Sequence, residues 1–270
     1  MNEAIRRTAL IGVSLGLCAL VMALGVGALV GRDGMAAPGV LASGQPVVAF
    51  LTALVVGAIA LAISMGVGRL TNAVVGLFVF GGALSVLSMR SGSLVDAVVN
   101  DITPLRLGIE TLLWSAALLL AAMGMFRVAG PLKDIEFDPD DPYRGSPFSP
   151  MGLLAAAAGL VTLLPVWLIA RSELKGQALA AATIGALAAA ILGRLLAKKT
   201  QPVLLFVIPC VAGGIGHVLI HFMYGTVELS DVPAGLTPLA TVMPIDYAAG
   251  TLIGAAIGIG WTKSSPEKRP

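Results

Sequence analysis

Charged side chains are scarce in this sequence, and their scarcity excludes an ordinary soluble protein. Only 12% of the 270 residues are charged, whereas globular chains contain about 25%. Hydrophobic residues make up 57%, and the mean hydropathy is +0.94. A soluble surface cannot be made from this composition, because most of its apolar area would have to face water. The net charge of +2 is also too small to indicate a nucleic-acid partner.

Cysteine, histidine and aromatic residues are few as well. The two cysteines, Cys18 and Cys210, both lie in apolar runs, so a disulfide framework is not expected. The glycine-rich residues 213–216 lie inside the same run as Cys210 and do not follow a strand, which excludes a phosphate-binding loop. No nucleophile is grouped with a histidine and an acid. We therefore expect no cofactor and no catalytic residues, and an enzyme is the least favoured class.

The hydrophobic residues form eight continuous runs, and a membrane-spanning helix needs about 20 such residues. The runs are Thr8–Val30, Pro46–Val67, Thr71–Met89, Leu105–Phe126, Met151–Ala170, Gln177–Leu196, Pro202–Tyr224 and Met243–Trp261. They do not alternate with polar residues, so they do not fit the strands of a membrane barrel. The sequence therefore predicts an all-α integral membrane protein with about eight transmembrane helices.

The first run follows Arg6 and Arg7, an arrangement that a signal peptide shares. A cleaved signal has an apolar core of about 7–15 residues, which is shorter than this run. We expect the run to be retained as the first membrane helix.

The basic residues predict the orientation, because Lys and Arg concentrate in cytoplasmic loops. With eight spans, twelve of the 17 fall on one side and five on the other. The first group is Arg6, Arg7, Arg69, Arg127, Lys133, Arg144, Arg194, Lys198, Lys199, Lys263, Lys268 and Arg269, and the second is Arg32, Arg90, Arg106, Arg171 and Lys175. We therefore expect a multi-pass protein of the cell (inner or plasma) membrane with both termini in the cytoplasm.

Residues 130–150 form the longest polar stretch and separate a first half, residues 1–129, from a second half, residues 151–270. The stretch is rich in acids and prolines, namely Asp134, Glu136, Asp138, Asp140 and Asp141 with prolines at 131, 139, 142, 147 and 150. This composition is typical of an extended, solvated linker. A calcium-binding loop would need glycine where Tyr143 stands.

The two halves resemble each other in sequence. Without a gap, Pro104-Leu105-Arg106 and Thr111-Leu112 match Pro244-Ile245-Asp246 and Thr251-Leu252. Shorter matches are Gly44-Gln45 with Gly176-Gln177, Gly68-Arg69-Leu70 with Gly193-Arg194-Leu195, and Leu77-Phe78-Val79 with Leu205-Phe206-Val207. They indicate two parallel four-helix repeats, related by an axis along the membrane normal. The alternative is a chance alignment of apolar helices.

Glycines four residues apart mark faces for close helix packing. Gly250, Gly254 and Gly258 share one face of the last run, and Gly12 and Gly16 share one face of the first. Missing side chains let two helix backbones approach closely in a membrane. These faces predict tight packing, either within the chain or with another subunit.

Five ionisable residues fall inside or at the ends of the apolar runs, where such residues usually have a function. They are Arg106, Glu110, His217, His221 and Asp246, all toward the predicted outer face. If the repeat exists, Arg106 and Asp246 could form an ion pair across its axis. The less specific interpretation is that both reach the headgroups or cap a helix. The two histidines lack a third ligand nearby, so no metal site is predicted.

Two hypotheses about function follow. The first is a small-solute or ion transporter, or a channel-like protein, with these five residues at the outer mouth of a pathway near the axis. Pro165, Pro209 and Gly213-Gly214 would loosen helices along it. The alternative is a non-catalytic membrane subunit or scaffold whose glycine faces pack against partners. Beyond the lipid bilayer, the expected partners are therefore further copies of the chain or other membrane subunits.

Overall fold

The computed structural model describes residues 3–132, 134–135, 146–226 and 238–262. Apart from an isolated bridge between Val30 and Ala36, the regular structure in these ranges is helical. The prediction of an all-α chain is therefore confirmed.

The first half consists of four long helices and two short ones. Proline in the first turn begins α2 and α5, where its missing N–H costs no hydrogen bond. The side chains of Asn72 and Thr103 accept hydrogen bonds at the starts of α3 and α5. The elements are α1 (Glu3–Ala23), η1 (Val26–Ala28), α2 (Pro46–Leu70), α3 (Ala73–Arg90), α4 (Leu94–Val99) and α5 (Pro104–Ala129).

The second half is more interrupted. Its first membrane run is divided into α6, η2 and α7, and its third begins with η3 before α9. The elements are α6 (Pro150–Ala157), η2 (Ala158–Thr162), α7 (Leu163–Ile169), α8 (Lys175–Leu196), η3 (Pro202–Phe206), α9 (Ile208–Tyr224), α10 (Pro238–Thr241) and α11 (Pro244–Trp261).

Six helical segments are long and apolar enough to cross a membrane, which supports a polytopic membrane protein. They are Glu3–Ala28, Pro46–Leu70, Ala73–Arg90, Pro104–Ala129, Pro150–Ile169 and Lys175–Leu196. The helix α9 is apolar but shorter, and α11 is not among the six. Eight spans therefore stay a prediction.

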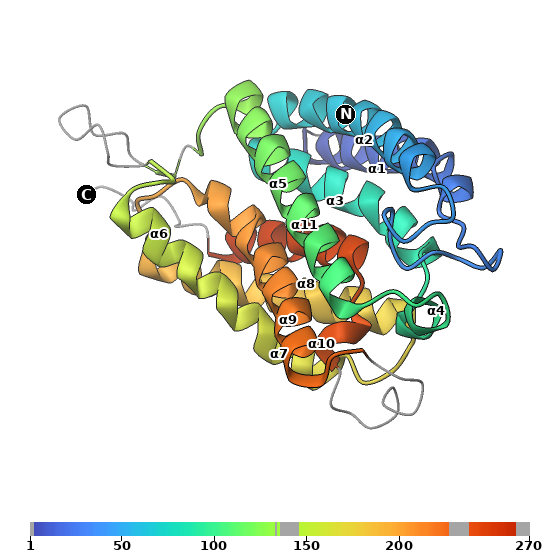
Figure 1. Cartoon of the computed structure of the whole chain (residues 1–270). Coiled ribbons are helices and arrows are strands. Elements are labelled where there is room, and N and C mark those ends of the chain that lie inside the picture. The colour runs from blue at the N-terminus through green and yellow to red at the C-terminus, as the bar shows by residue number, and fades with distance from the viewer. Residues whose placement is uncertain (1–2, 133, 136–145, 227–237, 263–270) are drawn as a thin grey trace, which may run out of the picture.

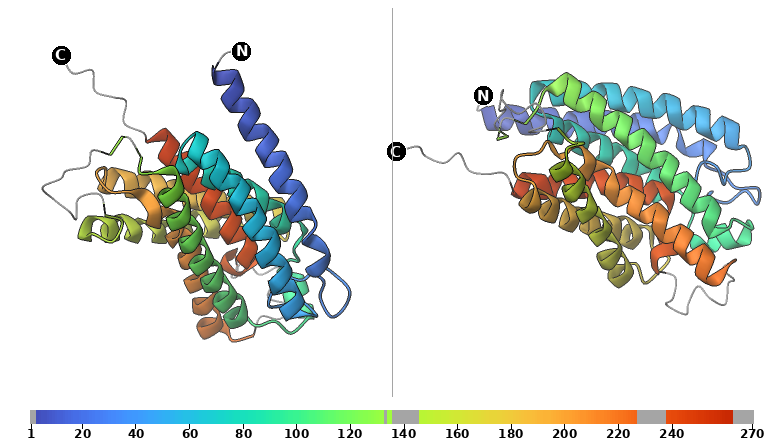
Figure 2. Two further views of the ribbon diagram at one scale, coloured as in Figure 1. Left: turned by 90° about the horizontal axis from the view of Figure 1, so that it is seen from above. Right: turned by 60° about the vertical axis from the view of Figure 1, so that its left-hand side comes forward.

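The helix α11 occupies the centre of the bundle. It packs against α8, α3, α5 and α9, and Figure 1 shows it with these neighbours around it. Almost all of its residues are buried. By contrast, α1 lies at the periphery (Figure 2) and exposes large apolar side chains such as Leu20, as a lipid-facing helix does.

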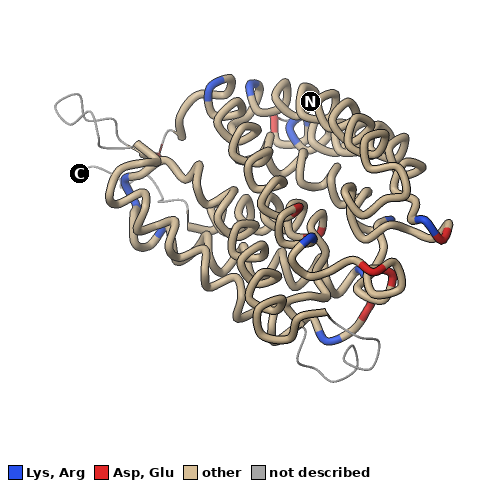
Figure 3. The backbone as a smooth tube through the Cα atoms, in the orientation of Figure 1, with Lys and Arg blue, Asp and Glu red and all other residues tan. Residues whose placement is uncertain are grey.

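The bundle has two distinct ends. The α4 end contains α4, residues 24–45, and the first turns of α5, α8 and α11; the linker end contains the last turns of α2, α5, α8 and α11. The start of α1 and the end of α11 lie at the same end (Figure 2). Charged residues gather at the helix ends and in connections, and most of the chain between them is uncharged (Figure 3).

The two prolines predicted to loosen helices lie next to breaks, whereas the glycine pair does not. Pro165 cannot donate a backbone hydrogen bond, and the 3-10 segment η2 ends just before its helix α7. Pro209 stands in the first turn of α9, after η3. Gly213 and Gly214 lie within continuous α9, so the expected break there is wrong. They allow close packing instead, because a Cβ on Gly213 would lie 2.5 Å from the ring of Tyr247.

Only part of the predicted linker lies in the described residues. Asp134 at its start and Ser149 at its end are described, whereas Glu136, Asp138, Asp140 and Asp141 lie outside the described ranges. The Ser149 hydroxyl accepts a hydrogen bond from the backbone N–H of Gly152 and so caps α6.

Candidate functional site

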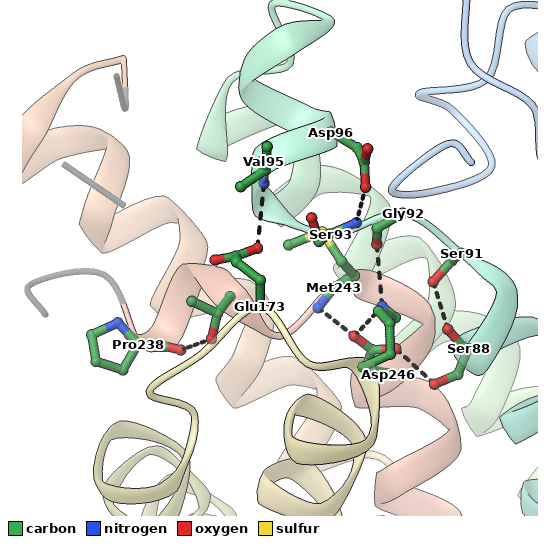
Figure 4. Close-up of polar contacts among 12 residues, drawn as sticks. Ser88, Ser91, Gly92, Ser93, Val95, Asp96, Glu173, Pro238, Met243 and Asp246 are labelled. Carbon is green, nitrogen blue, oxygen red and sulfur yellow. Dashed lines mark hydrogen bonds and ion pairs between the residues drawn. The ribbon is translucent and has the colours of Figure 1, made fainter. Parts of the chain in front are cut away.

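Asp246 is completely buried in the first turn of α11, and each of its oxygens has a partner. The Ser88 hydroxyl donates to Oδ1 at 2.6 Å, and the Met243 backbone N–H donates to Oδ2 at 2.9 Å. Lys175 Nζ lies 2.7 Å from the same Oδ2 and forms an ion pair with it. Figure 4 shows the carboxylate with Ser88 and Met243 beside it.

These contacts join the two halves of the chain at the α4 end. Lys175 is the first residue of α8, and its Nζ also donates to the carbonyl of Gly92 at 3.2 Å, just after α3. Asp246 and Lys175 belong to the second half, whereas Ser88 and Gly92 belong to the first. We call Ser88, Gly92, Lys175, Met243 and Asp246 the Asp246 junction.

The predicted ion pair between Arg106 and Asp246 is wrong. The guanidinium of Arg106 instead donates to the backbone carbonyl of Leu41, while Lys175 neutralises Asp246. The reason is local geometry. Arg106 is exposed on the outside of α5, whereas Asp246 faces inward beside the start of α8.

Glu110 is also almost completely buried, with 2% of its surface exposed. Its two oxygens accept hydrogen bonds from the backbone N–H groups of Val40 and Leu41, at 2.7 and 2.9 Å. Gly39 leaves the room, because a Cβ there would lie 2.5 Å from both oxygens. Two backbone donors therefore hold the carboxylate in a fixed position.

Glu110 lies at the wall of a cleft between α2 and α5 with a volume of about 330 Å³. The remaining wall is apolar and includes Phe50, Leu54 and Gly57 of α2 and Trp114 and Leu118 of α5. We call it the α2–α5 cleft. Small-molecule sites in proteins have volumes of about 300–1,000 Å³, so the cleft is large enough for a ligand.

The two histidines of α9 differ in their surroundings. His217 is completely buried, its Nδ1 lies 3.3 Å from the Thr111 hydroxyl, and its ring meets that of Tyr247 edge-on. His221, one turn further along, packs against Phe222. Throughout the described ranges, no group of three His, Cys, Asp or Glu residues is placed to hold a metal ion. His217 thus links α5, α9 and α11.

The glycines of α11 and α1 lie in opposite environments. A Cβ on Gly254 would lie 2.0 Å from the Thr183 carbonyl oxygen of α8, and Gly250 and Gly258 face α8 at similarly short distances. For Gly12 and Gly16, no described atom lies within 4 Å of an added Cβ. The face of α11 is therefore used inside the chain, and that of α1 is open.

A second buried ion pair lies at the linker end. Arg194, near the end of α8, contacts Asp134 at 2.8 Å, and their side chains are 4% and 10% exposed. The Leu132 backbone N–H also donates to the side chain of Gln201. Both ends of α8 are thus anchored by a buried carboxylate.

The sequence indicated Asp246 and Glu110, but not most of their partners. Lys175 and Ser88 stand at helix ends without any distinctive spacing, so no signal marked them. The short helix α4 did have a signal, since Ser93 and Asp96 form a capping box. In Figure 4, Glu173 also reaches the start of α4, where it accepts from the Val95 N–H.

Comparisons with protein-family models, with curated proteins and with solved structures found no match for this chain. The site is therefore interpreted from its own geometry.

Proposed function

We propose that this protein is a small-solute or ion transporter of the cell membrane, and that the Asp246 junction closes its outer end. In this proposal the α4 end faces outward, in agreement with the distribution of Lys and Arg. The observation that carries the proposal is the fully buried Asp246, which bonds Ser88 of the first half, while its ion-pair partner Lys175 bonds Gly92 of the first half.

A buried ion pair is a poor way to hold a static bundle together. Removing charges from water costs several kcal/mol per ion, and apolar residues often replace such pairs without loss of stability. Ionisable residues at membrane depth are therefore usually functional. Both members of this pair lie in the second half, but Asp246 also bonds Ser88 and Lys175 also bonds Gly92, both of the first half. The junction therefore fits a contact between the halves that forms in one conformation and breaks in another.

The ion pair between Arg194 and Asp134 also supports the proposal. Lys175 begins α8 and Arg194 lies near its end, so one helix carries a charged contact at each end of the bundle. Since α8 also packs tightly on α11, the two helices would move together. Breaking the Asp246 junction would separate them from α3 at the outer end.

The packing of the halves supports the proposed repeat. In the predicted repeat, α3 corresponds to α9 and α5 corresponds to α11. An axis that exchanges the halves would therefore turn the pair α3–α11 into the pair α9–α5. Both pairs are in contact. Transporters often carry their sites at the interface of repeats.

Flux measurements on reconstituted protein test the proposal. Vesicles loaded with potassium chloride would be prepared with the wild type, Asp246→Asn, Lys175→Met and the double variant. Each single variant leaves one buried group without its partner, which draws water into the junction, so both should release ions faster than the wild type. The double variant should release them more slowly than either single variant, because no unpaired charge remains.

A labelling experiment separates opening from unfolding. Ser88→Cys would be introduced after Cys18 and Cys210 are replaced by Ala, and a membrane-impermeant maleimide would be added. We expect labelling only when Asp246 is also changed to Asn. Folded single variants with wild-type flux and no labelling of position 88 would refute the transport proposal.

A scaffold is the second candidate, favoured by the open face of α1. Gly12 and Gly16 have space for another helix, and the neighbouring Val13 and Leu17 are exposed. A scaffold should lose a co-purifying membrane partner when Gly16 is changed to Leu. A chain that purifies alone in mild detergent would exclude it.

A further inference from the structure

The α2–α5 cleft carries a carboxylate in an otherwise apolar wall, and the transport proposal does not use it. Glu110 is one of its lining residues, and each of its oxygens accepts one backbone N–H. A carboxylate has about four acceptor positions. The two backbone N–H groups occupy two of them and the Trp114 side chain a third, so about one remains for a donor that enters from the cleft.

The second half shows what the same helix pair looks like when it is closed. The gapless match pairs Pro104 with Pro244, so that Glu110, Trp114 and Leu118 correspond to Gly250, Gly254 and Gly258. On α11 these glycines bring α8 into direct contact. On α5 the larger side chains line the cleft that opens between α5 and α2. The opening is thus a specific property of the first half.

The shape of the cleft indicates the form of its ligand. Along α5 its wall extends from Glu110 to Ala121, which corresponds to about 16 Å of helix. Apart from the carboxylate at one end, the named wall offers aliphatic and aromatic side chains. An elongated molecule with an apolar tail and a single polar head matches this distribution.

The chemistry of Glu110 indicates the head. Both oxygens of Glu110 already accept hydrogen bonds from backbone N–H groups, so a head that donates a hydrogen bond suits the site. A primary amine or a hydroxyl can donate, whereas an ionised carboxylate head has no donor. A quaternary ammonium has the charge of an amine but no donor. Comparing it with the amine therefore distinguishes a hydrogen bond from electrostatic attraction alone.

We propose that the α2–α5 cleft binds a single-chain amphiphile whose amine or hydroxyl head donates a hydrogen bond to Glu110 and whose tail lies between α2 and α5.

Quenching of Trp114 fluorescence by a brominated tail tests this site. Trp167 and Trp261 are exposed, and changing both to Phe leaves Trp114 as the only indole of the chain. The protein would be reconstituted in phosphatidylcholine vesicles without bromine. Four dodecyl chains brominated at the tail would then be added, with primary amine, alcohol, carboxylate or trimethylammonium heads.

We expect the amine and the alcohol to reach half-quenching at about tenfold lower concentration than the other two, the ratio that one hydrogen bond to a charged group gives. Glu110→Gln should remove this preference. Equal quenching by all four chains would mean that bulk lipid fills the cleft, and would overturn the proposal. So would a trimethylammonium chain as effective as the amine.

Two glycines of α2 provide a matched pair of variants if Glu110→Gln does not fold. Gly57 lines the cleft and Gly66 does not, and neither would place an added Cβ within 4 Å of another described atom. Gly57→Leu should fill the cleft and abolish amine-specific quenching, whereas Gly66→Leu should leave it unchanged. Amine-specific quenching that persists in Gly57→Leu would locate the ligand elsewhere and refute the proposal.

Discussion

The interfaces α8–α11 and α2–α5 show how side-chain size decides how closely two membrane helices approach each other. On α11, Gly250, Gly254 and Gly258 face α8, and an added Cβ at each would lie within 3 Å of it. On α5, residues with the same spacing, Glu110, Trp114 and Leu118, face a cleft of about 330 Å³. Without a hydrophobic driving force between helices in lipid, close packing depends on small residues. Bulky residues leave room that a ligand can use.

The charged residues at the starts of α11 and α5, at the α4 end, also differ in burial. On α11, Asp246 is buried and pairs with another helix of its own half. At the matching position of α5, Arg106 is exposed, and its guanidinium donates to the backbone carbonyl of Leu41. At this one position, the closed interface thus has a charge inside the bundle, and the open one has a charge at the surface.

The largest effect is expected from Gly254→Leu. Its side chain would collide with the backbone of α8 at Thr183, which cannot move without displacing the helix. We expect a loss of about 3 kcal/mol or more, seen as aggregation or a strongly lowered midpoint of thermal unfolding in detergent. Gly260→Leu on the same helix is the control, because no described atom lies within 4 Å of its added Cβ. Similar midpoints for the two variants would contradict the close packing of α8 and α11.

Asp246→Asn should have the next largest effect. It leaves the ammonium of Lys175, which is 16% exposed, without its counter-charge, and breaking a buried pair costs about 3–5 kcal/mol. Chemical unfolding in detergent measures this cost. Arg106→Gln tests the matching position and should cost about 1 kcal/mol or less, since it removes one hydrogen bond at the surface. Equal costs would show that the two positions do not differ in burial as described.

Gly39→Ala should have an intermediate effect. The added methyl group would displace the Glu110 carboxylate from the Val40 and Leu41 N–H groups. We expect a loss of about 1–3 kcal/mol, together with weaker amine-specific quenching of Trp114. Gly27→Ala in the same connection meets no described atom within 4 Å and should change neither measurement. Unchanged quenching in Gly39→Ala would show that the position of the carboxylate does not matter.

Gly57→Ala should have the smallest effect, with the opposite sign. Its Cβ enters open space in the cleft, and alanine stabilises a helix interior by about 0.5–1 kcal/mol relative to glycine. The same change at Gly254 should destabilise, because the Cβ would meet the Thr183 carbonyl at 2.0 Å. If both substitutions shifted the unfolding midpoint in the same direction, the two interfaces would not differ as described.

Much of the fold could be predicted from the sequence, because continuous apolar runs have few other solutions in a membrane. Each of the eight runs corresponds to one helical segment or to consecutive ones, and Pro46 and Pro104 stand at helix starts. The helical breaks beside Pro165 and Pro209 follow from their missing N–H groups. Gly213 and Gly214 misled the prediction, since glycine serves close packing as readily as a break, and only the neighbouring Tyr247 ring decides between them.

The candidate site could be predicted only in part. Asp246 and Glu110 were identifiable because ionisable residues are rare in such runs. Their partners were not, because hydrogen bonds from Ser88 and Lys175 to Asp246 cross 158 and 71 positions of the chain. The two N–H donors to Glu110 are backbone groups, which every residue carries.

The sequence by itself determined that this protein is helical and membrane-embedded, and which of its residues are ionisable at membrane depth. Composition decides these features, since hydrocarbon accepts only helices with internally satisfied backbones from runs of this kind. The tertiary structure alone decided that α11 lies at the centre, that Asp246 pairs with Lys175 and not with Arg106, and that a cleft opens beside Glu110. These features depend on which helix faces meet, and that is set by packing across the whole bundle.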